Sequence, residues 1–331
     1  PSALEKYRTM LAEQIQYFKV TQYFFFKQWS ELKHYANQKG IKIIGDMPIY
    51  VAADSVEVWT KPELFQLDEE RNPLFVAGVP ADQFSATGQL WGNPLYAWEE
   101  HKKQGYAWWI HRIEESFKIY DVLRIDHFKG FSDYWQVDGK AEVAKDGSWQ
   151  PGPGYDLFKA VKEQLGDLPI IAEDLGNIDD KARKLLTDCN YPGMKILQFG
   201  FEDVSGESLD SPHYCIPHSI VYTGTHDNDV TNGWYNSLTE QQQQYINDYT
   251  HRHEDESICQ AMIRQLFATV SNTAIATMQD VLDLPASSRM NVPSTIGGNW
   301  QWRMQQSDLT QDKKDFLAKM TTLYQRANQE K

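Results

Sequence analysis

The fold is indicated first by residues 122–128, VLRIDHF, in which a short apolar run stops at the carboxylate of Asp126. Two later strings follow the same plan, IIAEDLG at residues 170–176 and VYTGTHDND at residues 221–229. Strands that end in acids and are separated by helical stretches are typical of a parallel β/α barrel, which gathers its catalytic residues at one end of its strands. Three acids there suit glycosyl transfer or hydrolysis, in which one carboxylate attacks and another donates a proton.

Length and composition limit the classes of function. The chain has 331 residues, of which 41% are hydrophobic, and this is enough for a large core. A formal net charge of −14 argues against a nucleic-acid partner, which would require a basic patch. The three cysteines are few and widely spaced, which favours a reducing compartment such as the cytoplasm. No apolar run approaches the roughly 20 residues of a membrane span, so we expect no membrane partner.

The hydrophobic pattern alternates between strands and helices. Strands are predicted at residues 41–46, 122–128, 169–175, 194–201 and 219–227, and in an apolar, β-rich segment at residues 273–282. Helices are predicted at residues 2–39, 101–120, 155–165, 179–190, 239–249, 255–271 and 309–328. A barrel has eight strands, and the six predicted here also leave an open parallel sheet as an alternative.

The predicted organisation is a single catalytic domain over residues 1–331. Residues 47–98 are rich in Pro, Gly and aromatic side chains and are too long for an ordinary loop, so they are predicted to form an inserted subdomain over the catalytic face. Residues 129–154 are predicted to be a loop, and residues 309–328 a C-terminal helix. Tryptophans in helices are predicted to be core residues, whereas those in loops could equally stack on sugars.

Acids end four of the predicted strands, at Asp46, Asp126, Glu173 and Asp227. Any one of them could simply cap the following helix, but four separate caps are less favoured, and glutamate is not a preferred capping residue. Arg124 lies two residues before Asp126, on the same side of an extended strand. An arginine there would hold the carboxylate of Asp126 ionised, as a nucleophile requires.

The run His226–Asp229 could alternatively be a set of metal ligands. Adjacent residues of an extended strand point to opposite sides, and no second histidine lies at a ligand spacing such as HExxH, so the carboxylate interpretation is favoured. No GxSxG string indicates a serine nucleophile. Chemistry that uses carboxylates alone requires neither a metal nor an organic cofactor, so we expect none.

These residues resemble the 4-α-glucanotransferases called amylomaltase or disproportionating enzyme, which belong to the α-amylase clan. The resemblance rests on the three acid-containing strings and on GDMPIYVA at residues 45–52, LWGNP at residues 90–94 and GGNW at residues 297–300. Each motif is short, but their order and spacing run through nearly the whole chain. The second and third of these added strings point to amylomaltase rather than to a hydrolytic α-amylase.

The resemblance implies an α/β fold of the TIM (β/α)8 type and a role for each motif. It implies that Asp126 is the nucleophile, Glu173 the general acid/base and Asp227 the third acid, which holds sugar hydroxyls. The implied substrate-binding residues are Asp46, Asp82, Trp91, Arg124, His226, Asn291, Phe199 and Asp203. The implied substrates are maltooligosaccharides or other α-1,4-glucans such as starch and glycogen. A retaining mechanism would place the carboxyl groups of Asp126 and Glu173 roughly 5 Å apart.

The chain departs from that family at its beginning. Family members start with about two more strands, and the strand near residue 41 resembles the family's third, so strands three to eight of the barrel are expected here. We therefore expect a chain that is truncated at its N-terminus. A hydrolase of the same clan and an inactive glucan-binding fragment stay as alternatives, and the sequence does not indicate an oligomeric state.

Overall fold

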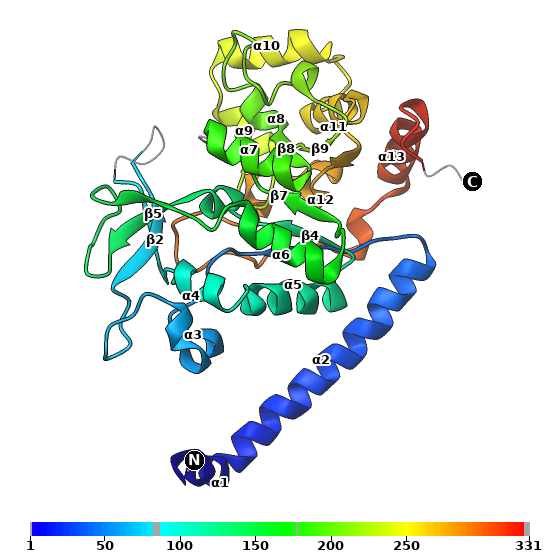
Figure 1. Ribbon diagram of the computed structural model, residues 1–331. Coiled ribbons are helices and arrows are strands. Elements are labelled where there is room, and N and C mark those ends of the chain that lie inside the picture. Colours follow the sequence, from blue (N-terminus) through cyan, green and yellow to red (C-terminus); the bar gives the residue numbers. More distant parts are fainter. Residues whose placement is uncertain (1, 82–86, 177, 328–331) are drawn as a thin grey trace. The chain divides into compact units, whose positions relative to one another are not determined.

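The computed structural model describes residues 2–81, 87–176 and 178–327 (Figure 1). The chain divides into two compact units, Pro1–Ile171 and Ala172–Lys331. Each unit contains a parallel sheet of three strands, which together account for the six strands predicted from the sequence. The single catalytic domain over residues 1–331 stays a prediction.

The parallel sheet of the first unit has the strand order β1-β4-β7, and β7 ends at the unit boundary. The bounds are Ile44–Met47 for β1, Val122–Ile125 for β4 and Ile170–Ala172 for β7. Leu123 and Ile125 of β4 are fully buried, as expected for a parallel strand that is covered on both faces. Helix α5, Ala107–Ile119, packs against β1, β4 and α6, Tyr155–Leu165. The sheet thereby carries the ends of β1 and β4 side by side.

Two predicted helices of the first unit are each broken once. The helix predicted at residues 2–39 consists of α1, Ser2–Met10, and the long α2, Ala12–Gln38 (Figure 1). The helix predicted at residues 101–120 is divided into α4, Trp98–Lys103, and α5. Gly105 and Tyr106 adopt φ values of 61° and 57° at this break, a left-handed conformation that ends a helix.

The C-terminal end of α2 is fixed to the end of α5. The indole Nε1 of Trp29 donates to the Ile119 carbonyl at 2.9 Å, and Lys33 Nζ donates to the Tyr120 carbonyl at 2.9 Å. These bonds use carbonyl groups at the end of α5 that have no partner within the helix.

A four-stranded antiparallel sheet, with the order β3-β2-β5-β6, completes the first unit. The bounds are Phe75–Val79 for β2, Gln89–Pro94 for β3, Asp133–Asp138 for β5 and Ser148–Pro151 for β6, and the short helix α3, Val56–Thr60, precedes them. The prediction that residues 129–154 are a loop is therefore wrong. β5 pairs with β6 and also with β2, more than fifty residues earlier, and no local pattern indicates the pairing with β2.

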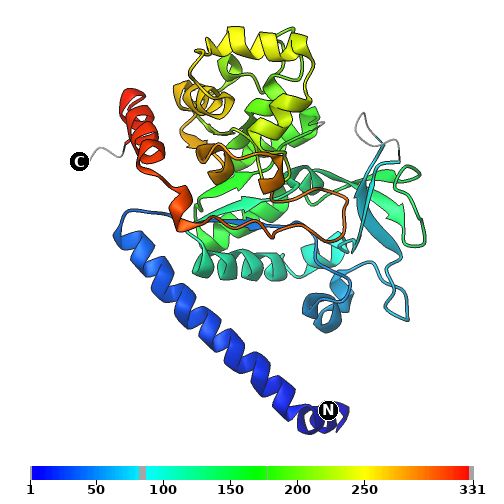
Figure 2. The same ribbon diagram turned by 180° about the vertical axis from the view of Figure 1, so that it is seen from behind.

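The second unit has a parallel sheet of order β10-β9-β8. Its strands are β8, Gly193–Ile196, β9, Ser219–Tyr222, and β10, Thr273–Ile275. Its helices are α7, Asp180–Cys189, α8, Leu197–Gly200, α9, Thr231–Ser237, α10, Glu240–Thr250, α11, Ile258–Ala268, α12, Met278–Val281, and α13, Gln311–Leu323. Helix α11 contacts α9, α10, α12, α13 and β10. Figure 1 labels α9 to α13, and Figure 2 shows the same ribbon from behind.

All three parallel strands of the second unit are shorter than predicted, and the one predicted at residues 219–227 ends at Tyr222. The strand predicted at residues 194–201 ends at Ile196 and continues as α8, and the segment predicted at residues 273–282 ends at Ile275 and continues as α12. In the last case Thr277 is the reason, because its Oγ1 accepts a hydrogen bond from the Asp280 amide at 3.2 Å and so begins a helix.

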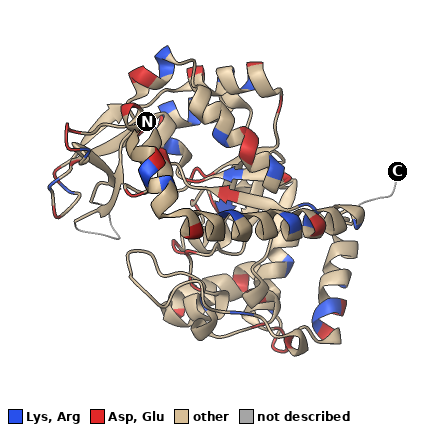
Figure 3. Ribbon diagram, turned by 90° about the horizontal axis from the view of Figure 1, so that it is seen from below, with Lys and Arg blue, Asp and Glu red and all other residues tan. Residues whose placement is uncertain are grey.

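The tryptophans of the predicted helices differ in burial. Trp109 of α5 is fully buried, whereas Trp29 of α2 and Trp108 of α5 are half-buried, so the expected core position is confirmed for Trp109. Trp234 of α9, a helix that the sequence did not predict, is 8% exposed within the core of the second unit. Positions of Lys and Arg are interspersed with those of Asp and Glu along the helices and loops (Figure 3). Within the described ranges, no helix is long and apolar enough to span a membrane.

Candidate active site

Asp46 and Asp126, the two candidate acids of the first unit, both contact the guanidinium group of Arg124. The pairing of β1 with β4 places Asp46 beside Arg124, and Asp126 follows β4 directly. Arg124 Nη1 donates to both carboxylate oxygens of Asp46, at 2.6 and 2.7 Å, and to Asp126 Oδ1 at 3.0 Å. The side chain of Arg124 is only 9% exposed, whereas the two carboxylates are 41% and 43% exposed. The expected same-side arrangement of Arg124 and Asp126 is thus confirmed.

Asp126 also lines a cavity of about 150 Å³ in the first unit. The other lining residues are Pro48, Ile49, Tyr50, Trp91 and Asn93. The ring of Trp91 lies 6.2 Å from that of Tyr50 and 4.9 Å from that of His127, measured between ring centroids. The predicted binding residue Trp91 therefore lies at the same cavity as the predicted nucleophile.

Burial controls the protonation of the rings around this cavity. It lowers the pKa of His127 to about 4, against the opposing attraction of the Asp126 carboxylate, and it raises the pKa of Tyr50 far above its ordinary value. Both rings are therefore neutral near pH 7, and Arg124 supplies the positive charge that contacts Asp126.

The predicted binding residue Asp82 lies outside the described residues.

Glu173 and Asp174 follow β7 in the second unit and have different partners. Glu173 is 9% exposed, and its Oε1 accepts a hydrogen bond from the Leu175 amide at 2.7 Å. Asp174 Oδ1 accepts from the Met194 amide at 2.7 Å, and burial raises the pKa of this carboxyl group. Asp174 is thus taken up by the backbone of β8, which leaves Glu173 as the candidate for chemistry.

Asp227 is held by residues from the loop that follows the 3-10 turn Ala286–Ser288. Asn291 Nδ2 donates to Asp227 Oδ1 at 2.6 Å, and His226 Nε2 lies 3.3 Å from Asp227 Oδ2. Arg289 Nη2 donates to the backbone carbonyl of Asp227 at 2.6 Å. The ring of Trp300 lies 5.1 Å from that of His226. Three predicted site residues, His226, Asp227 and Asn291, are therefore in direct contact.

Two further predicted binding residues follow β8. Phe199 lies on α8, and its carbonyl accepts from Ser208 Oγ at 3.3 Å. Asp203 accepts from the Ser205 amide at 2.9 Å and from the Ser205 hydroxyl, and these bonds lower the pKa of its carboxyl group. The roles of both residues toward a substrate stay predictions, as does the separation of Asp126 from Glu173.

Sequence reasoning missed Tyr50, Asn93 and Arg289. The first two belong to the quoted motifs at residues 45–52 and 90–94, but nothing in the sequence singles them out within those motifs. Arg289 follows the short 3-10 turn Ala286–Ser288, and only its hydrogen bond to Asp227 marks it as part of the candidate site.

One group of described residues has ligand atoms close enough to hold a metal ion. It consists of His111, Glu114 and Glu115 on α5, of which the first two are exposed, and it includes none of the predicted acids.

Comparisons with known proteins agree with these features. The sequence profile of a protein family described as 4-alpha-glucanotransferase matches residues 1–310. The chain is 53% identical to the 4-alpha-glucanotransferase of Streptococcus pneumoniae serotype 4, over 99% of this chain and 65% of that protein. It is 44% identical to the 4-alpha-glucanotransferase of Clostridium butyricum, over 98% of this chain and 66% of that protein. The solved structure of amylomaltase from Streptococcus agalactiae in complex with acarbose is 59% identical, with a TM-score of 0.97, and the match covers 99% of this chain and 66% of that one.

Parallel strands with acids at their carboxyl ends, together with this structural likeness, define a protein of the (β/α)8-barrel class, which confirms the predicted fold class. The chain belongs to the 4-alpha-glucanotransferase family, as its motifs had indicated. It spans 65% of the length of the Streptococcus pneumoniae relative.

Proposed function

We propose that this chain acts as a 4-α-glucanotransferase. In this reaction a segment of an α-1,4-glucan moves from a donor to the 4-hydroxyl group of an acceptor glucan. The observation that carries the proposal is the position of Asp126, which contacts Arg124 and lines a cavity that also contains Trp91. Family membership and the acarbose complex of the related amylomaltase support an α-glucan as the substrate.

The proposed first step forms a covalent glycosyl-enzyme. A carboxylate oxygen of Asp126 attacks the anomeric carbon of the donor while the bond from that carbon to the glycosidic oxygen breaks. Glu173 gives its proton to the departing oxygen, and the reducing-end fragment leaves with a new hydroxyl group. Glu173 is 9% exposed and so is shielded from bulk water, which suits a group that must pass its proton to the glucan.

The proposed second step reverses the first with a different alcohol. The 4-hydroxyl group of an acceptor glucan gives its proton to Glu173 and attacks the anomeric carbon, and Asp126 leaves as a carboxylate. The α-1,4 bond is remade with retained configuration. Asp227 accepts hydrogen bonds from hydroxyl groups of the sugar in both steps. These steps use carboxyl groups alone.

Transfer requires that an acceptor sugar outcompete water at the glycosyl-enzyme. The rings of Trp91 and Tyr50 line the cavity at Asp126 and provide apolar surface for a sugar face. Such a surface favours a bound acceptor and excludes water from the reacting carbon. We also propose a cytoplasmic location, which the few, widely spaced and free cysteines support.

The test is incubation of the chain with maltotriose and separation of the products by length. Glucose together with maltopentaose and longer chains supports transfer, and Asp126→Asn should then abolish all of these products. Glucose and maltose without longer chains would indicate the hydrolase instead. If maltotriose binds but no product forms, this chain is an inactive glucan-binding fragment.

A further inference from the structure

Arg289 contacts two segments that are far apart in the sequence. Its Nη2 donates to the Asp227 carbonyl at 2.6 Å, and its Nε donates to the Asn291 carbonyl at 2.9 Å. A guanidinium group is planar and holds its donors at fixed angles, so two simultaneous bonds fix the position of both carbonyl groups. The bond to Asp227 spans 62 residues of sequence.

Asn291 joins the same two segments from the other side. Its backbone amide donates to the His226 carbonyl at 3.1 Å, and its side-chain Nδ2 donates to Asp227 Oδ1 at 2.6 Å. Arg289, Asp227 and Asn291 therefore form a closed ring of hydrogen bonds. Because each bond restrains the others, loss of one donor should loosen the whole ring.

The loop that carries this ring is itself braced. The Trp300 amide donates to the Met290 carbonyl at 2.7 Å, and the Val292 amide donates to Asn299 Oδ1 at 3.0 Å. Arg289 and Asn291 thus sit on a loop with internal support, which makes it a fixed frame for Asp227.

We propose that Arg289 is a positioning residue for the third acid, Asp227, and that Asn291 acts with it. This inference rests on the proposed function, in which the Asp227 carboxylate meets the sugar. Arg289 bonds the backbone of Asp227, and Asn291 bonds one carboxylate oxygen, so together they fix the direction in which the carboxylate points. Asn291, which was expected to contact the substrate, thus also holds the carboxylate of Asp227.

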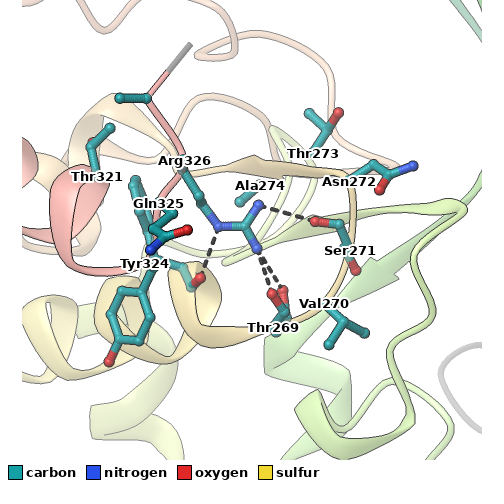
Figure 4. A pocket seen from close by; sticks show the side chains of 12 residues that line it. Thr269, Val270, Ser271, Asn272, Thr273, Ala274, Thr321, Tyr324, Gln325 and Arg326 are labelled. Carbon is teal, nitrogen blue, oxygen red and sulfur yellow. Dashed lines mark hydrogen bonds between the residues drawn. The ribbon is translucent and has the colours of Figure 1, made fainter. Parts of the chain in front are cut away.

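Arg326 provides a matched control in the same unit. Its Nε donates to the Phe267 carbonyl at 2.8 Å, and its Nη1 to the Ser271 carbonyl at 3.0 Å (Figure 4). Its Nη2 donates to the Thr269 carbonyl at 2.6 Å and to the Thr269 hydroxyl at 3.3 Å (Figure 4). These bonds close the end of α11 at a cavity of about 780 Å³ whose lining includes none of the predicted site residues. Arg326 therefore performs the same kind of bonding as Arg289 without a contact to a predicted catalytic acid.

The experiment compares Arg289→Ala, Arg289→Lys and Arg326→Ala in the full chain, with kcat, KM for maltotriose and Tm as readouts. Arg289→Ala should lower kcat by about 100-fold, the size expected when a reacting group is misplaced by an ångström. Its KM should change by less than about threefold, because the loss falls on the transition state. Arg289→Lys restores one bond and should recover part of the rate. Arg326→Ala should lower Tm while kcat stays within about twofold of the wild-type value.

A double variant tests whether the two residues act as one unit. Arg289→Ala with Asn291→Ala should be no slower than the slower single variant, since the first loss already loosens the ring. Independent, multiplied losses would contradict the proposal. So would an Arg289→Ala variant whose kcat is unchanged, or whose loss of rate is matched by Arg326→Ala at equal loss of Tm.

A second measurement separates failure of this inference from failure of the proposed function. If the wild-type chain makes no products, the proposed function fails, and hydrogen exchange then tests Arg289 by itself. Peptides that contain Asp227 and Asn291 should exchange faster in Arg289→Ala than in the wild type, and at the wild-type rate in Arg326→Ala. Unchanged exchange of these peptides in Arg289→Ala would overturn the inference.

Discussion

The ends of β4 and β9 hold their acids in opposite ways. At the end of β4, Asp126 is held through charge, because the buried guanidinium of Arg124 lies between it and Asp46. After β9, Asp227 receives a neutral amide on its carboxylate, and the nearby guanidinium of Arg289 goes to its backbone carbonyl instead. In the proposed reaction, the first arrangement would keep an anion ready to attack, and the second would fix a direction for hydrogen bonding to a sugar.

This contrast predicts different sensitivities in the two places. The cluster at β4 depends on a balance of charge, since two carboxylates share one cation that is almost completely withdrawn from water. The cluster after β9 depends on geometry, since its hydrogen bonds link two loops. Substitutions that change charge should therefore lower activity most in the cluster at β4. In the cluster after β9, a substitution that changes only the shape of a side chain should be enough to lower activity.

The largest expected effect is that of Asp126→Asn. An amide cannot form the glycosyl-enzyme, so transfer from maltotriose should fall by about 10⁴-fold or more, a loss typical of removing one member of a reacting unit. Asp227→Asn keeps the shape of its side chain and should lose less. Product chromatography of both variants gives the comparison, and equal losses would remove the distinction between attacking and orienting acids.

Arg124→Met should be the next most damaging change. It removes the shared cation and leaves Asp46 and Asp126 as neighbouring carboxylates, which should cost about 10²- to 10³-fold in kcat/KM. Addition of Asp46→Asn should recover part of that loss, because one of the two like charges disappears. A double variant that is slower than Arg124→Met would show that charge balance is not what Arg124 supplies.

Asn291→Asp tests the neutral character of the second cluster. A carboxylate placed against Asp227 Oδ1, where Nδ2 now lies at 2.6 Å, should repel it and lower kcat by about 100-fold. Asn291→Ala only removes a donor and should cost about tenfold. Steady-state rates on maltotriose rank the two, and the reverse order would mean that the missing donor, rather than the added charge, causes most of the loss.

Trp91→Ala should change the choice of acceptor more than the rate. Loss of the ring opens the cavity at Asp126 to water, so the ratio of transfer to hydrolysis should fall by roughly tenfold. The ratio follows from free glucose and from products longer than maltotriose. Trp59→Ala, which removes an exposed tryptophan of α3, serves as the control and should leave the ratio unchanged. An unchanged ratio in Trp91→Ala would remove this ring from the explanation.

The smallest expected effect concerns stability in acid. Burial lowers the pKa of both His101 and His127 in the first unit to about 4. An unfolded histidine takes up a proton near pH 6.5, so the unfolded state binds more protons than the folded state between about pH 6.5 and pH 4. The stability that the neutral rings provide is complete above this window and is lost as the pH falls through it.

His101→Phe should therefore weaken the dependence of Tm on pH. The fall in Tm between about pH 7.5 and pH 5 should shrink by a few degrees, since up to about 2 kcal/mol of the loss belongs to this ring. His218→Gln, at an exposed position of the second unit, is the matched control and should keep the wild-type fall. A fall that is unchanged in His101→Phe would exclude this ring as a source of acid sensitivity.

The elements that were predictable from the sequence are those with local signals. The six parallel strands, the helix at residues 155–165 and the pairing of Arg124 with Asp126 each follow from a short pattern. The pairing of β5 with β2 was missed because the two strands lie far apart in the sequence, although the Tyr134 and Val137 positions of β5 are both buried. Arg289 was missed for a related reason, since an arginine after a short turn has no pattern until the fold brings Asp227 to it.

The antiparallel sheet of the first unit has a consequence for protein engineering. Its inner pair, β2 and β5, comes from the two segments that follow β1 and β4, and each supplies the other's hydrogen-bonding edge. Trp91 lies on β3 of the first segment, whereas Asp126 lies just before the second. Replacing only one of the two segments with that of a homologue would disrupt the pairing of β2 with β5. The two segments should therefore be exchanged together.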